Sequence, residues 1–121
     1  MQIKFPPNFK FGVADADLQV IGEDNTRKYE GSELTMWNNF AIASGKCYKN
    51  QTPGIGIDRY HLWKEDIEIM KKMGVRNYRT SVSMSRVLKE NGAINDKAIS
   101  WYTQYFKALK KSGITIYATL Y

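Results

Sequence analysis

The chain has 121 residues, of which 43% are hydrophobic and 25% are charged, a composition typical of one small globular domain. No apolar run approaches the roughly 20 residues that span a bilayer, the N-terminal residues lack the apolar core of a secretory signal, and a single cysteine, Cys47, excludes an internal disulfide framework. The net charge is +6, but the lysines are scattered singly or lie at the ends of predicted helices, which favours a solvated surface over a nucleic-acid interface.

The first predicted strand is Phe9–Val13, which lies close to the N-terminus. A long segment punctuated by glycine follows it, from Asp15 to Ile57, and only Ser32–Ala43 has a helical pattern there. Connections of this length are uncommon in compact domains and are usually functional or disordered. Because the segment leaves the carboxyl end of the first strand, it lies at the end of the sheet where ligand sites are built.

Two helices with strong periodicity come next, each with apolar residues at spacings of three and four and charged residues on its other faces. Asp58 is the expected N-cap of the first helix, and Gly74 is its expected stop. The second helix is expected to begin at an Asn95 or Asp96 cap and to end at Gly113. The sequence therefore predicts helices of several turns over both stretches.

Each helix precedes a run rich in β-branched and aromatic residues, Val75–Val82 in one case and Ile114–Tyr121 in the other. The two stretches repeat one another, since Met70–Thr80 aligns with Leu109–Thr119 at an offset of 109 − 70 = 39 residues. A helix, a glycine stop and a strand at that offset predict successive α/β units with parallel strands and right-handed crossovers. The last strand would lack a covering helix, so further polypeptide or a partner chain must cover its edge.

Several residues that could carry chemistry have simpler interpretations. Gly54 and Gly56 begin a dinucleotide-like motif, but Arg59 stands at the third glycine position and no strand precedes it. His61 is the only histidine, so a metal cluster or a nucleophilic relay would depend on it alone, and a helix-surface or packing role is favoured. Cys47 has basic neighbours but no histidine placed to activate it, which favours an exposed and unreactive thiol.

Two polar segments are more suggestive, because they follow the first two predicted strands. Ala14–Gln19 follows the first and Arg79–Arg86 ends the second, and polar groups at the carboxyl ends of parallel strands are expected to converge. Arg79 alternates with Tyr78 and Thr80, so its side chain is expected on one face of the sheet among apolar neighbours. A strand-interior arginine is costly unless a carboxylate pairs with it, so we expect an internal salt bridge or a functional partner.

Six ordered blocks also carry a resemblance to a known family. They are Phe5–Gly12, Ala14–Gln19, Met36–Phe40, Asp58–Ile67, Met73–Arg79 with Ser81, Ser83 and Arg86, and Gly113–Tyr121. Over essentially the whole chain, the sequence resembles the N-terminal portion of glycoside hydrolase family 1, the β-glucosidase and 6-phospho-β-glycosidase family.

The resemblance implies an α/β fold that comprises the first three β/α units of a (β/α)8 TIM barrel, with residues 1–121 as the N-terminal part of a single catalytic barrel. It also implies a retaining mechanism, in which two glutamates about 5 Å apart act as acid/base and nucleophile. The family carries them in an Asn-Glu-Pro motif and a Thr-Glu-Asn-Gly-like motif, and neither motif occurs in this sequence. Glu90-Asn91-Gly92 is interpreted as a turn, so we expect the chain alone to lack glycosidase activity.

Two residues match positions to which the family gives a role. Gln19 matches the glutamine that binds sugar hydroxyls, and Arg79 matches the arginine that holds the nucleophile glutamate, which would supply a partner for its charge. Trp37 and His61 match positions that we interpret as packing. Two departures from the family's usual residues are Ile21, where a glutamate is common, and Met84, where a tryptophan is common.

The resemblance therefore predicts the N-terminal fragment of a cytoplasmic retaining β-glycosidase that hydrolyses terminal β-linked sugars, without metal or nucleotide cofactor. One alternative is a non-catalytic partial barrel that binds sugars or assembles with another chain; it predicts a stable oligomer that binds sugar without turnover. A weaker alternative is a small basic nucleic-acid-binding domain, which predicts affinity that falls steeply with salt.

Overall fold

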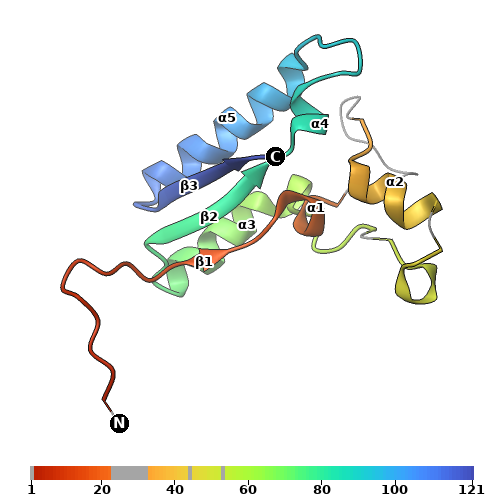
Figure 1. Ribbon diagram of the computed structural model, residues 1–121. Coiled ribbons are helices and arrows are strands. Elements are labelled where there is room, and N and C mark those ends of the chain that lie inside the picture. The colour runs from red at the N-terminus through yellow and green to blue at the C-terminus, as the bar shows by residue number, and fades with distance from the viewer. Residues whose placement is uncertain (1, 23–32, 44, 53) are drawn as a thin grey trace.

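The computed structural model describes residues 2–22, 33–43, 45–52 and 54–121. Its centre is a parallel sheet of three strands in the order β1 (Val13–Ala14), β2 (Asn77–Val82) and β3 (Thr115–Leu120) (Figure 1). One line of register runs from Ala14 through Arg79 to Tyr117. The predicted parallel pairing of strands that follow successive helices is thereby confirmed.

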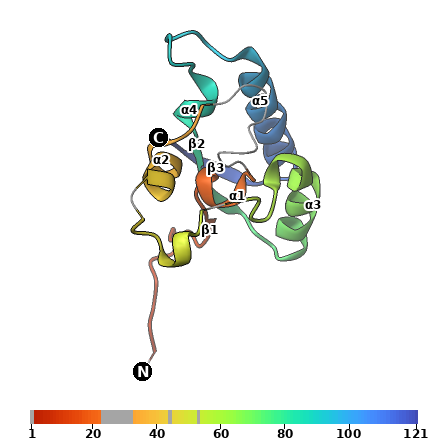
Figure 2. The same cartoon turned by 90° about the vertical axis from the view of Figure 1, so that its right-hand side faces the viewer.

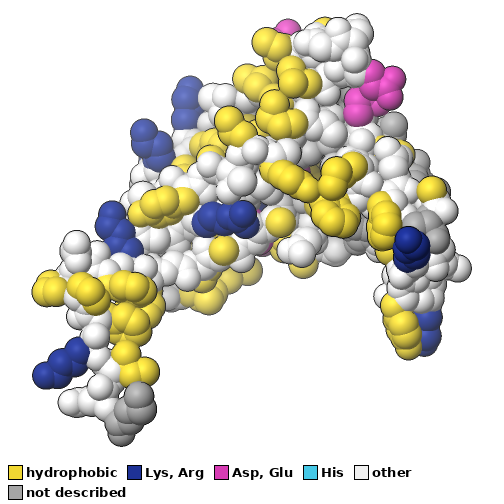
Figure 3. All heavy atoms as spheres, in the orientation of Figure 1, with side chains coloured by type: hydrophobic (Ala, Val, Ile, Leu, Met, Phe, Trp, Pro, Cys, Tyr) yellow, Lys and Arg dark blue, Asp and Glu magenta, His cyan; other side chains and the backbone are white. Residues whose placement is uncertain are grey.

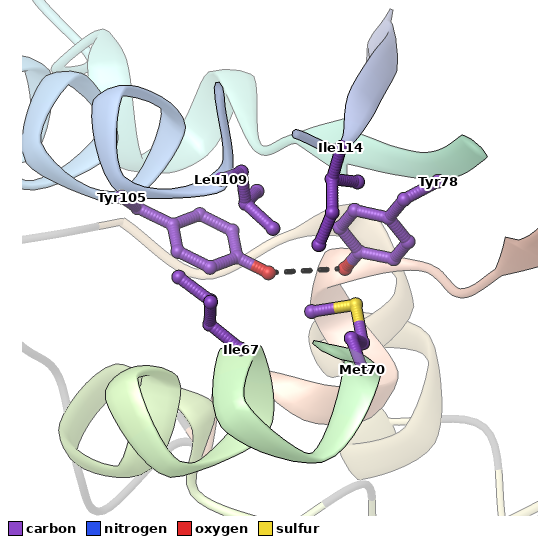
Figure 4. Close-up of a cluster of buried hydrophobic side chains, with 6 residues drawn as sticks. All are labelled: Ile67, Met70, Tyr78, Tyr105, Leu109 and Ile114. Carbon is purple, nitrogen blue, oxygen red and sulfur yellow. Dashed lines mark hydrogen bonds between the residues drawn. The ribbon is translucent and has the colours of Figure 1, made fainter. Parts of the chain in front are cut away.

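Two long helices, α3 (Arg59–Lys72) and α5 (Asp96–Lys111), cover one face of this sheet (Figures 1 and 2). Their apolar faces meet the side chains of β2 and of the entry to β3, and Figure 4 shows the core that results. Its buried members are Ile67, Met70, Tyr78, Tyr105, Leu109 and Ile114. The apolar face of each amphipathic helix therefore packs on the sheet and buries one of its faces, as predicted.

The two helices end at the glycines that the sequence indicated. Gly74 and Gly113 have φ values of 71° and 74°, the left-handed conformation that glycine adopts without steric cost. The predicted N-caps are only partly right, because Asp58 and Asn95 occupy the cap positions but make no side-chain capping hydrogen bond. The Asp58 carboxylate instead lies 3.0 Å from His61 Nδ1.

The long connection after β1 contains more regular structure than its sequence pattern predicts. It forms α1 (Asp17–Val20), α2 (Met36–Ala43) and a 3-10 turn, η1 (Tyr48–Asn50), and a further short helix, α4 (Met84–Val87), follows β2. Of the predicted helix Ser32–Ala43, the structure confirms Met36–Ala43, while Ser32 lies outside the described residues.

The first strand was placed too early and made too long by the sequence pattern. The structure pairs only Val13–Ala14 with β2, and the predicted residues Phe9 to Gly12 lie before the strand. The side chains of Phe5, Phe9 and Phe11 instead pack against one another, with ring centroids 4.7 to 4.9 Å apart and two of the three pairs edge to face. Aromatic residues in this stretch therefore form a local cluster, which explains their strand-like composition without a strand.

The other face of the sheet has no helix over it within the described residues. Figure 3 views this side of the molecule, and hydrophobic side chains spread across it and gather at its N-terminal end. Arg79 and Tyr117 share one register line on this face, and both are exposed. β3 also has β2 as its only neighbour among the described strands, so its other edge is uncovered there, as the sequence predicts.

Candidate site at the carboxyl ends of the strands

A cavity of about 640 Å³ lies where the three strands end. Short helix α1 and the turn after β2 form part of its wall, and α2, which stands beyond the strand ends in Figure 1, forms another part. The lining is mainly apolar: Leu18, Met36, Trp37, Phe40, Ala41, Met84 and Tyr121 line it together with polar residues that include Gln19, Gln51, Ser81 and Ser83. A mostly apolar hollow with a few polar groups is the usual form of a small-molecule site.

Helix α2 and the residues just before it are held over the cavity by two contacts, one with the residue after β3 and one with α4. Trp37 Nε1 donates a hydrogen bond of 2.8 Å to the hydroxyl of Tyr121, the residue that follows β3. The Glu33 amide, three residues before α2, donates a hydrogen bond of 2.8 Å to the carbonyl of Ser85 in α4. The long connection is therefore tied to the segments that follow β2 and β3, and Trp37 lines the cavity as well as making one of these contacts.

Asp15, the residue directly after β1, is the centre of a largely buried polar cluster. Its Oδ2 accepts hydrogen bonds from the Tyr78 hydroxyl at 2.7 Å and pairs with Arg59 Nη1 at 2.6 Å. Its Oδ1 accepts a hydrogen bond of 2.7 Å from Thr80 Oγ1. Both carboxylate oxygens are thus occupied by groups from β2 and α3, on the face of the sheet that the helices cover.

Arg59 completes this cluster at the first position of α3. Its side chain is 7% exposed, and its Nε donates to Asp66 Oδ2 at 3.1 Å in addition to the pair with Asp15. Burial by itself lowers the pKa of Arg59, but neighbouring Tyr105, Tyr78 and Asp15 raise it well above its ordinary value. Arg59 therefore remains a cation with two carboxylate partners.

Gln19 lies on α1 and lines the cavity, with an exposed side chain. Two hydrogen bonds fix this turn: the Asp17 amide donates to Ser81 Oγ at 2.7 Å, and the Gln19 amide donates to the Ala16 carbonyl at 2.9 Å. Gln19 therefore lines a mainly apolar hollow from a backbone that is tied to β2.

Arg79 lies on the uncovered face of the sheet and outside the cavity lining. Within the described residues, the prediction of a buried Arg79 in an internal salt bridge is wrong, whereas a functional partner from outside this chain stays a prediction. Its side chain is exposed, and its Nη1 donates to the Asp15 carbonyl oxygen at 3.1 Å. Strand alternation correctly placed Arg79 on the face opposite Tyr78, but it could not tell whether that face is covered.

The family model described as glycosyl hydrolase family 1 matches residues 1–121. This chain belongs to glycosyl hydrolase family 1. It is 37% identical over 119 residues to β-glucosidase A of Thermotoga maritima, which covers 98% of this chain and 26% of that protein. In three dimensions it resembles the AHE enzyme of Alicyclobacillus herbarius, with a TM-score of 0.89 and 33% identity over 98% of this chain and 26% of the other.

A family 1 β-glucosidase of the fungus Humicola insolens, solved in complex with glucose, gives a TM-score of 0.87 at 33% identity over 99% of this chain and 25% of that one. This family 1 chain thus spans about a quarter of the length of such relatives. Its three parallel strands correspond to an incomplete (β/α)8 barrel, which agrees with the predicted fold class.

The structure also places two other candidate residues of this family 1 chain, His61 and Cys47. His61 is exposed and paired with Asp58, which agrees with a helix-surface role. Cys47 is a partly buried thiol in the cavity lining, so the prediction of an exposed thiol is wrong. Over the described ranges, no three His, Cys, Asp or Glu residues are grouped to hold a metal ion, and no helix is long and apolar enough to cross a membrane.

Sequence reasoning missed the Asp15–Arg59 pair and the contact of Trp37 with Tyr121. Arg59 attracted notice only because it interrupts a glycine motif. One signal was available, since an arginine at the start of an amphipathic helix, on its buried side, requires an acidic partner. The sequence could not say that this partner lies 44 positions earlier, at Asp15.

Proposed function

We propose that this chain forms the N-terminal quarter of the (β/α)8 barrel of a retaining β-glycosidase that hydrolyses terminal β-linked sugars. The observation that carries the proposal is the match of the whole chain to family 1 together with a cavity at the carboxyl ends of the strands, the end at which barrel enzymes build their active sites. On this proposal residues 1–121 belong to one catalytic domain, and both catalytic glutamates come from segments beyond the matched quarter.

In this role, Gln19 hydrogen-bonds hydroxyl groups of the sugar through its side-chain amide. Its place in the cavity lining supports this, because an amide both donates and accepts and so suits a hydroxyl. The apolar side chains around it supply surface for the carbon faces of the ring and for the group linked to it. The proposed ligand is therefore a small-molecule β-glycoside.

Arg79 acts in the same proposal as the cation beside the nucleophile glutamate. A guanidinium has five donors in a planar fork, of which the hydrogen bond to the Asp15 carbonyl uses one. A carboxylate placed against the fork would be held by charge and geometry and kept ionised, as a nucleophile must be. The exposure of Arg79 on the uncovered face supports a partner that later strands of the barrel bring to it.

No metal or nucleotide is assigned a part in the proposed reaction, since two carboxylates suffice for retaining glycoside hydrolysis. The proposed compartment is the cytoplasm, on the grounds of a single cysteine. The proposal assigns the uncovered β3 edge to the next strand of the same barrel.

The test is a chimera that joins residues 1–121 to the remaining three-quarters of β-glucosidase A of Thermotoga maritima. We expect the folded chimera to hydrolyse a nitrophenyl β-glucoside and the isolated 121-residue chain not to. Gln19→Ala in the chimera should lower kcat/KM by about tenfold or more, because a sugar hydroxyl loses its partner. Gln51→Ala is the matched control, since Gln51 is another exposed glutamine in the cavity lining.

A cooperatively folded chimera without hydrolytic activity would contradict the proposal. If such a chimera still bound gluconolactone, the non-catalytic sugar-binding alternative would replace it. Equal effects of the Gln19 and Gln51 substitutions would remove the assigned role of Gln19 while leaving the enzymatic function in place.

A further inference from the structure

We propose that Asp15, held by Arg59, is a positioning residue that fixes both Arg79 and the segment that carries Gln19. The inference rests on the proposed function, because it concerns the two residues to which that function gives a role. It goes beyond that function in assigning a task to a buried ion pair that touches no substrate.

The side chain of Asp15 is fixed from the helix-covered side of the sheet. Tyr78, Thr80 and Arg59 donate to its two oxygens at 2.6 to 2.7 Å. The first two donors belong to a strand whose side chains are packed in the core, and the third begins α3. Three short contacts from rigid elements leave the carboxylate one position, and only 16% of the Asp15 side chain is exposed.

Arg59 is itself fixed, so it can serve as an anchor. Its guanidinium pairs with both Asp15 and Asp66. The central guanidinium carbon, Cζ, lies 5.7 Å from the ring centroid of Tyr78 and 6.0 Å from that of Tyr105. A guanidinium bound on two edges and packed against two rings cannot rotate without losing several contacts. The position of Asp15 is therefore set by the packed core.

The backbone of the same residue contacts Arg79, whose side chain lies on the other face of the sheet. The Asp15 amide donates to the Arg79 carbonyl at 3.0 Å, and the Asp15 carbonyl accepts from Arg79 Nη1 at 3.1 Å. One residue thus binds Arg59 through its side chain and Arg79 through its backbone. A shift of Asp15 would carry the Arg79 guanidinium with it.

The short segment from Asp15 to Gln19 is hydrogen-bonded to β2 at two points, the amides of Asp15 and Asp17. Two residues after Asp15, the Asp17 amide donates to Ser81 Oγ in a buried hydrogen bond of 2.7 Å, and α1 begins there. Gln19 lies on the first turn beyond this tie. Asp15 and Ser81 therefore fix the position of the start of α1 relative to β2. The packed core in turn fixes the position of Asp15.

The test uses the active chimera, with Asp15→Asn as the principal substitution. The amide keeps the shape of the carboxylate but loses its charge and places an N–H group against donors. We expect kcat/KM to fall by about ten- to a hundredfold, mostly through kcat, since displacements near 1 Å cost on that order. Arg59→Lys, which keeps the charge, should retain more activity than Arg59→Met.

The matched control is Leu109→Ala, which destabilises the fold from a fully buried position in α5. Assayed well below its unfolding temperature, this variant should keep its kcat, whereas Asp15→Asn should not. A loss of kcat that merely follows stability in both variants would overturn the positioning role. An unaffected Asp15→Asn beside an impaired Gln19→Ala would overturn it too, while leaving the proposed function intact.

A second measurement is independent of turnover and decides the question if the chimera is folded but inactive. Amide hydrogen exchange at Asp17 and at Asp15 reports the two hydrogen bonds to β2. We expect Asp15→Asn to accelerate exchange at both amides by about tenfold or more relative to the core of α5. Unchanged exchange at both would refute the inference whatever the activity.

Discussion

Arg59 keeps its positive charge in a largely buried position because two carboxylates and two aromatic rings surround it. Such a cluster need not be more stabilising than an apolar one, because desolvation offsets much of the attraction. Replacing only the arginine has a different effect, because it leaves carboxylates in the cluster without their cation. The cluster therefore specifies geometry more than it adds stability.

Arg59→Met should accordingly lower the free energy of unfolding by about 3–5 kcal/mol, because Asp15 and Asp66 lose their shared cation. Urea unfolding followed by circular dichroism measures the loss. Arg79→Met provides the control, since it replaces the same residue type at an exposed position and should cost within about 1 kcal/mol. Similar losses for the two variants would contradict the view that burial makes Arg59 different.

The ends of the elements, rather than their middles, create the site. Trp37 of α2 contacts the residue after β3, Glu33 before α2 contacts α4, and α1 contacts β2 through Asp17. The Tyr121 backbone also pairs with its neighbours, since the Met84 amide donates to its carbonyl at 2.8 Å. The cavity walls are thus short elements, each tied to the sheet by hydrogen bonds far apart in the sequence.

Helix α5 offers a test of how one of its ends is held. Asn95 occupies the N-cap position without a capping hydrogen bond, and its Nδ2 donates to the Arg86 carbonyl at 3.0 Å in a buried contact. Asn95→Asp keeps a good capping residue but replaces the donor by an acceptor. We expect a loss of about 1–3 kcal/mol in the free energy of unfolding, from a buried carbonyl left facing a carboxylate.

Urea unfolding measures this loss, and Asn91→Asp is its control, because Asn91 is exposed and uses its Oδ1 as an acceptor for the Ala93 amide. A carboxylate preserves that acceptor, so the control should be nearly neutral. If Asn95→Asp were neutral or stabilising, the capping role expected from the sequence would be the better description.

The elements show what a single sequence can and cannot predict. Helices α3 and α5 and their glycine stops were predictable because a periodic pattern over several turns has one simple explanation. Helices α1 and α4 have four residues each, too few for any period to show. The aromatic stretch before β1 looked like a strand because composition does not distinguish pairing with a sheet from local packing of aromatic rings.

The candidate site follows the same division. Gln19 could be predicted to lie near the strand ends, because it follows the first strand closely and is matched by a family motif. The Asp15–Arg59 pair could not, since side chains 44 positions apart meet only through the packing of α3 on the sheet. Alternation gave the correct face for Arg79 but not its exposure, which depends on parts of the barrel that this chain does not contain.

At the scale of the whole molecule, one face of the sheet has a dense aromatic core and the other is open. Tyrosines dominate the core: Tyr78, Tyr102 and Tyr105 are all buried, and the Tyr105 hydroxyl lies 3.2 Å from that of Tyr78 (Figure 4). Burial is the main cause that raises the pKa of each, to about 12 for Tyr105 and well above the ordinary range for the other two. The folded state therefore favours the neutral phenols.

This preference makes the stability of the fold sensitive to alkali. In the unfolded chain tyrosines lose their protons near pH 10, whereas in the folded chain they hold them to higher pH, so above about pH 10 the unfolded state binds fewer protons. The free energy of unfolding must then fall as pH rises, by up to about 1.4 kcal/mol per pH unit for each such tyrosine. Below about pH 9 the contribution is fully present and stability should not vary through these groups.

Urea unfolding midpoints between about pH 8 and about pH 12 measure the effect. Tyr105→Phe should reduce the alkaline decrease in the free energy of unfolding per pH unit by about the contribution of one proton. The variant also loses a hydrogen bond, so its free energy of unfolding is lower at every pH. Tyr48→Phe is the control, since Tyr48 is 76% exposed and should leave the slope as it is. A slope that Tyr105→Phe does not change would mean that the alkaline response arises elsewhere, because each buried phenol that holds its proton must contribute its own share to the linkage.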